Sequence, residues 1–181
     1  MKNKLIPIYR EQEIYTLFYD TVHEKLVLFP HRKNAPLAYV YLIILVLLGS
    51  WYFNDIYQPY KDPLFNIILF LVVIVFSYVF AKIFMNSYYI QRTEETVYLD
   101  NESMENCAIQ GMKQLRMELY LGGGISVLFT VAGFALFFIF SQLVLLTFGG
   151  LGVVAIFLIL LTRPFTRIKV LKKFQSKEIR L

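Results

Sequence analysis

The sequence predicts an all-α integral membrane protein: a four-helix transmembrane bundle with a small cytosolic β-hairpin and an amphipathic interfacial helix. Composition is the first reason. Of the 181 residues, 57% are hydrophobic and 17% are charged, with a mean hydropathy of +0.56, whereas soluble domains are nearer half apolar and a quarter charged. Four apolar runs are the second reason, at 37–53, 64–85, 120–140 and 143–162. Each is near the ~20 residues that cross about 30 Å of hydrocarbon.

Basic residues predict the orientation of these four spans. Segment 1–36 holds six Lys and Arg residues and segment 163–181 holds seven, whereas the loop between the first two spans has only Lys61. Basic residues gather on the cytosolic side of a membrane. We therefore expect a multi-pass protein of the cell membrane with both termini in the cytosol. The net charge of +5 fits this basic excess, and no nucleic-acid partner is expected.

The N-terminal segment, 1–36, contains two runs that alternate in the manner of strands, at 14–20 and 25–29. The intervening "TVHE" predicts a four-residue turn opened by Asp20. Tyr15 and Phe18 are the candidate partner-binding residues of this hairpin. An isolated hairpin is marginally stable, and strands at 96–100 and 167–173 are candidates to extend it. Alternatively, the aromatic residues of the segment rest among lipid headgroups.

Two further features complete the organisation of the chain. The central loop becomes amphipathic after Ser103, with apolar residues at helical spacing: Met104, Ala108, Met112, Leu115 and Leu119. This helix lies along the membrane interface or runs directly into the third span. The expected parts are an N-terminal segment (1–36), a first transmembrane hairpin (37–85), a cytosolic loop (86–118), a second transmembrane hairpin (119–162) and a basic tail (163–181).

Small residues recur on one face of the third and fourth spans. Lipid gives helices little hydrophobic reason to associate, so small residues that allow close backbone approach are the expected contacts. The candidate helix-packing residues are Gly122, Ser126, Thr130 and Gly133 in the third span, and Gly149, Gly152 and Ala155 in the fourth. The alternative is that glycine is simply common in membrane helices.

The predicted spans lack the residues that catalysis or ion coupling requires. Ionisable groups inside a bilayer are costly and are kept for function, yet no charge lies in the central part of any span. The second span holds the polar residues Asn66 and Ser77, and its Lys82 lies near the cytosolic end. His23 and His31 are expected to be solvated, and the single Cys107 excludes an intrachain disulfide. We expect no enzyme activity, no catalytic residue, no cofactor and no metal.

The basic tail is the clearest physical signal outside the spans. Each Lys or Arg near an anionic leaflet contributes about 1 kcal/mol of attraction. The candidate lipid-contact residues are Arg167, Lys169, Lys172 and Lys173, and their expected partners are anionic lipid headgroups. Alternatively, the tail only sets the topology.

One short stretch resembles a known family. The element "YREQEIYTLFYDTVHEKLVLFP" (residues 9–30), together with the basic tail, is similar to the tandem five-transmembrane proteins of Gram-positive bacteria. Some of these are immunity proteins against membrane-damaging toxins of the type VII secretion system. The family has five spans where this sequence predicts four, and the resemblance brings no functional residue with it. It implies a membrane-active protein toxin as the partner.

Three functions remain open at this point. The first is a non-catalytic polytopic membrane protein that binds a partner protein in or at the membrane, most concretely an immunity protein that neutralises a secreted toxin. The second is a regulatory or accessory subunit of a larger membrane transport complex. The third is a small transporter. A homo-oligomer is compatible with each of them.

Overall fold

A computed structural model describes residues 5–11, 14–31, 35–88 and 95–176 of the chain. The chain forms two compact units. Unit 1 takes its residues from three separate parts of the sequence: Met1–Lys33, Met85–Tyr120 and Ile159–Leu181. Unit 2 consists of the two intervening segments, Asn34–Phe84 and Leu121–Leu158.

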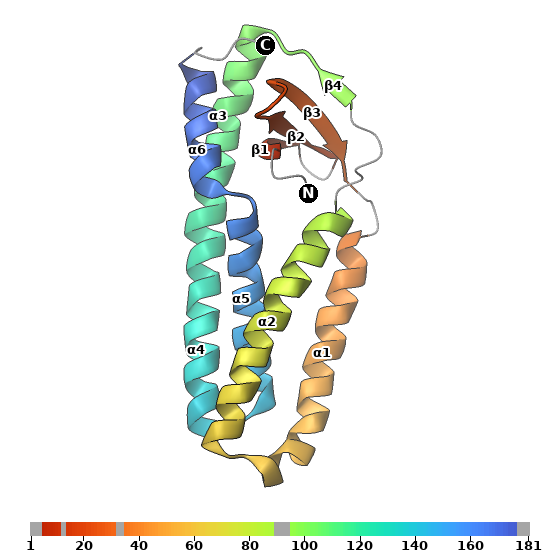
Figure 1. The fold of residues 1–181 in the computed structure, drawn as a ribbon, viewed down its shortest axis with the longest axis vertical. Coiled ribbons are helices and arrows are strands. Elements are labelled where there is room, and N and C mark those ends of the chain that lie inside the picture. Colours follow the sequence, from red (N-terminus) through yellow and green to blue (C-terminus); the bar gives the residue numbers. More distant parts are fainter. Residues whose placement is uncertain (1–4, 12–13, 32–34, 89–94, 177–181) are drawn as a thin grey trace. The chain divides into compact units, whose positions relative to one another are not determined.

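Four antiparallel strands form the sheet of unit 1, in the order β1-β2-β3-β4 (Figure 1). Their bounds are β1 Leu5–Glu11, β2 Tyr15–Asp20, β3 Lys25–Pro30 and β4 Glu95–Val97. Strands β2 and β3 confirm the predicted hairpin, in a register that pairs Asp20 with Lys25. Strand β4 overlaps the strand predicted at 96–100 and pairs with β3. The sheet is therefore larger than a hairpin.

Strand β1 is the one that the sequence does not predict. Pro7 lies within it and lacks an N–H group, which confines proline to edge strands and bulges. Both conditions hold here, because β1 is an edge strand and its pairing with β2 shifts register between Pro7 and Tyr9.

Helices α3 (Asn101–Met117) and α6 (Pro164–Gln175) lie side by side and pack on one face of the sheet (Figure 1). This apolar core joins Ile6, Ile8, Leu17, Tyr19 and Leu26 of the sheet to Met104, Ala108 and Leu115 of α3, and to Val170, Leu171 and Phe174 of α6. The ring of Tyr19 meets that of Phe174 edge to face, with centroids 5.2 Å apart.

This core corrects two predictions. The strand predicted at 167–173 is wrong, because that segment is helical and its apolar residues recur at helical spacing. The amphipathic helix exists, but Met104, Ala108 and Leu115 of its apolar face are buried against the sheet and α6, and do not lie open along an interface. It runs without a break through a π-helical turn (η2, Glu118–Gly123) into α4 (Gly124–Phe140), which confirms the direct continuation into the third apolar run.

Unit 2 is built from two helical hairpins. The first joins α1 (Ala35–Tyr57) to α2 (Pro63–Tyr88) through the 3-10 turn η1 (Gln58–Tyr60), and the second joins α4 to α5 (Leu143–Leu161). Ser141, in the left-handed conformation with φ 51°, makes the second turn. Four helices in the described residues are long and apolar enough to cross a membrane, as the sequence predicts.

Candidate functional site

Close backbone approach between α4 and α5 organises unit 2. A Cβ atom built on Gly133 would lie 2.7 Å from the Cα of Gly149 and 3.0 Å from the Leu145 carbonyl oxygen. A Cβ on Gly152 would lie 2.8 Å from the Ser126 carbonyl oxygen and nearer still to Thr130. Real Cβ atoms essentially never come within 3.0 Å of other heavy atoms. Only glycine therefore fits at these two positions without moving the helices.

The other candidate packing residues lie around this approach. Ser126 and Thr130 donate hydrogen bonds to carbonyl oxygens of their own helix, at 2.6 and 2.8 Å. Ala155 is half-buried. Gly122, by contrast, is exposed in the π-helical turn, so the close approach begins at Ser126, one turn later than expected.

Helix α5 also packs on α2, through Gly150, another small residue of the fourth span. A Cβ on Gly150 would lie 2.7 Å from Val73 Cγ1, and Ser77 Oγ donates to the Gly150 carbonyl oxygen at 3.1 Å. Helix α5 thus uses Gly149 and Gly152 toward α4 and Gly150 toward α2. The GlyGly pair in the sequence is the signal for this second contact.

A polar cluster joins the two hairpins of unit 2 at their turns. Asn66 accepts a hydrogen bond from the Tyr57 hydroxyl and donates one to Ser141 Oγ at 3.1 Å. The Gln58 side chain donates to the Ser141 carbonyl oxygen at 3.3 Å, and Asn54 accepts from the Leu143 N–H at 3.1 Å. These bonds give partners to Asn66, an uncharged polar residue within the second apolar run. The bonds to Ser141 and Leu143 join residues 75–89 positions apart, so sequence spacing alone does not reveal them.

Helix α1 is the least covered element of unit 2. None of its most hydrophobic 18-residue stretch is buried within the protein, although Tyr39 meets the rings of Phe80 and Phe84 on α2. An open apolar groove with a volume of about 240 Å³ runs between α1, α2 and α5. Val46, Phe76 and Val154 line its walls, and Ser77 and Thr147 supply its only hydroxyl groups. We name it the α1–α5 groove.

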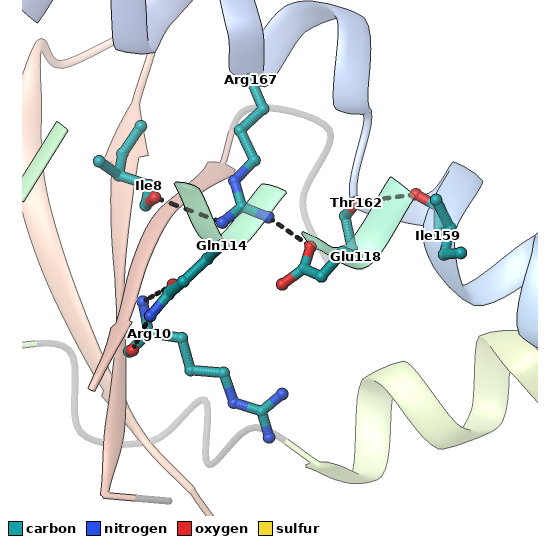
Figure 2. A network of polar contacts seen from close by, with 7 residues as sticks. All are labelled: Ile8, Arg10, Gln114, Glu118, Ile159, Thr162 and Arg167. Atoms are coloured by element: carbon teal, nitrogen blue, oxygen red, sulfur yellow. Dashed lines mark hydrogen bonds and ion pairs between the residues drawn. The ribbon is translucent and has the colours of Figure 1, made fainter. Parts of the chain in front are cut away.

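In unit 1, strand β1 approaches α3 closely at Gly111. A Cβ there would lie 3.2 Å from both the Ile8 carbonyl carbon and Leu171 Cδ2, and closer to the Ile8 carbonyl oxygen. Gln114, one turn further, accepts from the Arg10 N–H at 3.1 Å and donates to the Arg10 carbonyl oxygen at 2.7 Å (Figure 2). Backbone groups on the outer edge of β1 are thus satisfied by a helix, which protects an edge that would otherwise invite strand addition.

Arg167 lies inside unit 1 and not on its surface. Its side chain is 3% exposed, and its Nη1 donates to Glu118 Oε2 at 2.9 Å (Figure 2). Its Nη2 points to the Ile8 carbonyl oxygen at 3.4 Å. This corrects the expectation that Arg167 contacts lipid, since the guanidinium group joins α6 to the end of α3 and to β1. Lys169, Lys172 and Lys173 are exposed as expected.

The hairpin residues divide between the interior and the surface. Phe18 is 1% exposed and packs edge to face on Phe29, so it cannot be a surface contact for a partner; Tyr15 is half-buried. The expectation of two solvated histidines holds only for His23, whose side chain is 63% exposed. His31 is 6% exposed and bonds to Thr16 Oγ1 at 2.7 Å.

Asp20 and Cys107 are among the ionisable groups of unit 1 whose pKa values are displaced. Burial acts to raise the pKa of Asp20, but hydrogen bonds from the His23 ring and from the backbone N–H groups of Val22 and His23 outweigh it and lower the pKa. Burial first, and then the Glu11 carboxylate, raises the pKa of the Cys107 thiol. A raised pKa leaves less thiolate at neutral pH, and thiolate is the reactive form.

The described residues hold no group of three or more His, Cys, Asp or Glu side chains placed to bind a metal ion. Comparison of the chain with protein-family models, with curated proteins and with solved structures finds no match.

Proposed function

We propose that the chain is a multi-pass membrane protein that binds a partner protein in or at the bilayer, without catalysing a reaction. Its most concrete form is an immunity protein that neutralises a membrane-active toxin. The observation that carries the proposal is the α1–α5 groove, an open apolar surface beside a helix that the rest of the chain leaves uncovered.

The division of the chain into units supports a membrane position for unit 2. Unit 1 is assembled from three chain segments, and each of the two connections between them is a hairpin of long apolar helices. Two hairpins that each cross a bilayer out and back return the chain to the side from which it left. All three segments of unit 1 then meet on one side, and the basic excess of 1–36 and 163–181 assigns that side to the cytosol.

The hydrogen bonds of unit 2 support binding over transport or catalysis. Ser77, Thr130 and Thr147 each donate to a backbone carbonyl oxygen, and Asn66 bonds to Tyr57 and Ser141. Polar groups that carry a substrate or relay protons in a membrane face a bundle interior or a water-filled cavity. Here Ser77 and Asn66 bond to neighbouring elements, and Thr130 and Thr147 bond within their own helices.

The α1–α5 groove has the chemistry of a helix-binding surface. Close packing and interhelical hydrogen bonds, more than hydrophobicity, drive the association of helices in lipid. The groove offers apolar walls for close packing, and the Ser77 and Thr147 oxygens, whose protons are donated within the protein, can still accept a hydrogen bond from a partner. A transmembrane segment of a toxin would bind there by burying a face against α1 and α5. The toxin assignment itself rests on the resemblance of residues 9–30 to the immunity family.

A protection experiment tests this proposal. Each secreted toxin encoded beside the gene is expressed with and without the protein while membrane potential is followed. We expect wild-type protein to prevent depolarisation. Val46→Trp, which fills the groove, should abolish protection, whereas Leu45→Trp should not, because Leu45 is on the same helix, 68% exposed and outside the groove.

Three outcomes would contradict the proposal. Equal protection by both tryptophan variants would mean that the groove is not the binding surface. Proton-coupled uptake of a solute by liposomes containing only this protein would establish a transporter. Stable copurification with a channel or ATPase, without protection against any toxin, would establish an accessory subunit.

A further inference from the structure

A second groove lies on unit 1, between α3 and α6. Its volume is about 710 Å³, within the range of about 300–1,000 Å³ typical of ligand sites. Met112, Leu115, Leu119 and Ile168 form an apolar floor, with Tyr120 at one end. We name it the α3–α6 groove.

Three cations line this groove: Lys113 and Arg116 from α3, and Lys172 from α6. All three are exposed, and none makes an ion pair within the described part of the chain. On a helix, the side chains three and four positions from a given residue are its neighbours. None of these neighbouring positions around Lys113, Arg116 or Lys172 holds Asp or Glu within the described residues. The nearest carboxylate in sequence, that of Glu118, is bonded to Arg167 (Figure 2). Among the described residues, the positive charge of these three cations is therefore uncompensated.

Both walls of the groove continue directly from apolar helices. Tyr120 is the first residue of the apolar run 120–140. It follows Arg116 by four residues on one unbroken helix, which is about 6 Å along the helix axis at 1.5 Å per residue. On the other wall, α6 begins three residues after α5 ends. Tyrosine is enriched where membranes meet water. With unit 2 in the bilayer, as proposed above, each wall of the groove is joined to a membrane span by only a few residues.

We propose that the α3–α6 groove binds one anionic phospholipid. The phosphate of the headgroup lies among Lys113, Arg116 and Lys172, and the first part of an acyl chain lies on the apolar floor. The lipid is thereby a structural ligand that holds α3 and α6 at the membrane surface. This site differs from the tail surface expected from the sequence, because two of its three cations come from the central segment and Arg167 is not among them.

Native mass spectrometry of the full-length protein tests the site. The protein, in a mild detergent, is offered phosphatidylglycerol or phosphatidylcholine at equal concentration. Each cation near anionic lipid contributes a factor of about five, so removing three should weaken phosphatidylglycerol binding about a hundredfold. The test variant is Lys113→Gln/Arg116→Gln/Lys172→Gln. The control, Lys25→Gln/Lys169→Gln/Lys173→Gln, removes the same charge from exposed or partly exposed positions outside the groove.

We expect wild-type protein and the control to retain one phosphatidylglycerol, and the groove variant to lose it; the exchanged pair Lys113→Arg/Arg116→Lys should retain it. Equal losses in the groove variant and the control, or equal retention of both lipids by wild-type protein, would overturn the site. A shift from dimer to monomer in the groove variant, with lipid retention unchanged, would instead make the groove an interface between copies.

Alkaline carbonate extraction of membranes that contain the full-length protein is the second test. It distinguishes a failure of the lipid site from a failure of the proposed membrane position of unit 2. Retention in the pellet supports the position of unit 2 whatever the groove binds. Release into the supernatant would refute that position and the lipid site with it, without any reference to the toxin.

Discussion

Replacement of Gly133 by alanine tests the contact between α4 and α5 with a single methyl group. The new Cβ would be 2.7 Å from Gly149 Cα and 3.0 Å from the Leu145 carbonyl oxygen, where ordinary contacts are 3.4–4 Å. Both neighbours are backbone atoms, so no side-chain rotation relieves the overlap. The two helices must separate by several tenths of an ångström, which loosens every contact along this face.

The expected size of the effect follows from two opposing terms. Forcing an extra methyl group into a packed interior costs typically about 1–3 kcal/mol, whereas alanine in place of glycine favours a helix by about 1 kcal/mol. We therefore expect Gly133→Ala to lower the free energy of unfolding by up to about 2 kcal/mol. Gly124→Ala, on the same helix, is the matched control, since nothing lies within 4 Å of its Cβ position. It should leave stability unchanged or raise it by up to about 1 kcal/mol.

The assay is reversible unfolding of the purified protein in mixed micelles by added sodium dodecyl sulfate, followed by circular dichroism at 222 nm. Wild-type protein and both variants are compared at one detergent concentration. If Gly133→Ala and Gly124→Ala have the same midpoint, the two backbones do not meet as described, and the packing of unit 2 is refuted.

Three further predictions concern unit 1, and each is tested by thermal unfolding. Gly111→Ala places a methyl group against the Ile8 carbonyl group and should destabilise by about 1–3 kcal/mol, with no such loss for Gly49→Ala, which meets nothing within 4 Å. Glu118→Ala should lower the free energy of unfolding by about 3 kcal/mol, because it leaves the buried Arg167 cation unpaired. Arg167→Met should lower it by only about 1 kcal/mol, because the Glu118 carboxylate that remains is 38% exposed. The reverse order would contradict the burial of Arg167. The pKa of Asp20 is lower in the folded protein than its unfolded value of about 3.9. Its ionised carboxylate therefore stabilises the fold at pH values above the unfolded pKa, and this stabilisation is lost as the pH falls through the folded pKa. The melting temperature of Asp20→Asn should therefore depend less on pH below 4 than that of wild-type protein, and identical profiles would exclude the turn hydrogen bonds.

Local patterns in the sequence predict most of the elements. The hairpin follows from alternation around Asp20, and α3 from the helical spacing of Met104, Ala108 and Leu115, all of which the structure buries. The four long apolar helices follow from composition. These features depend on neighbours a few residues apart, which is the range that periodicity samples.

What the sequence does not predict depends on partners distant along the chain. In the sequence, Arg167 is indistinguishable from the other basic residues of the tail. Its partners Glu118 and Ile8 are 49 and 159 residues away, so local spacing does not indicate that it is buried. Phe18 is predicted to be exposed because an isolated hairpin has one face open to water. In the structure, residues on both faces of the sheet are buried. Pro7 conceals β1 for the same reason, since an edge position is defined only by the whole sheet.

The most direct test of the account asks whether the three segments of unit 1 share one side of a membrane that α1–α2 and α4–α5 cross. Single cysteines are placed at Val22, Asn106, Ser176 and, in the turn between α1 and α2, Lys61, in a Cys107→Ala background. Intact cells and inverted vesicles are then treated with a membrane-impermeant maleimide. We expect positions 22, 106 and 176 to react only in inverted vesicles, and position 61 only in intact cells. Reaction of position 61 from the same side as the other three, or of position 106 from the side opposite 22 and 176, would contradict this expectation.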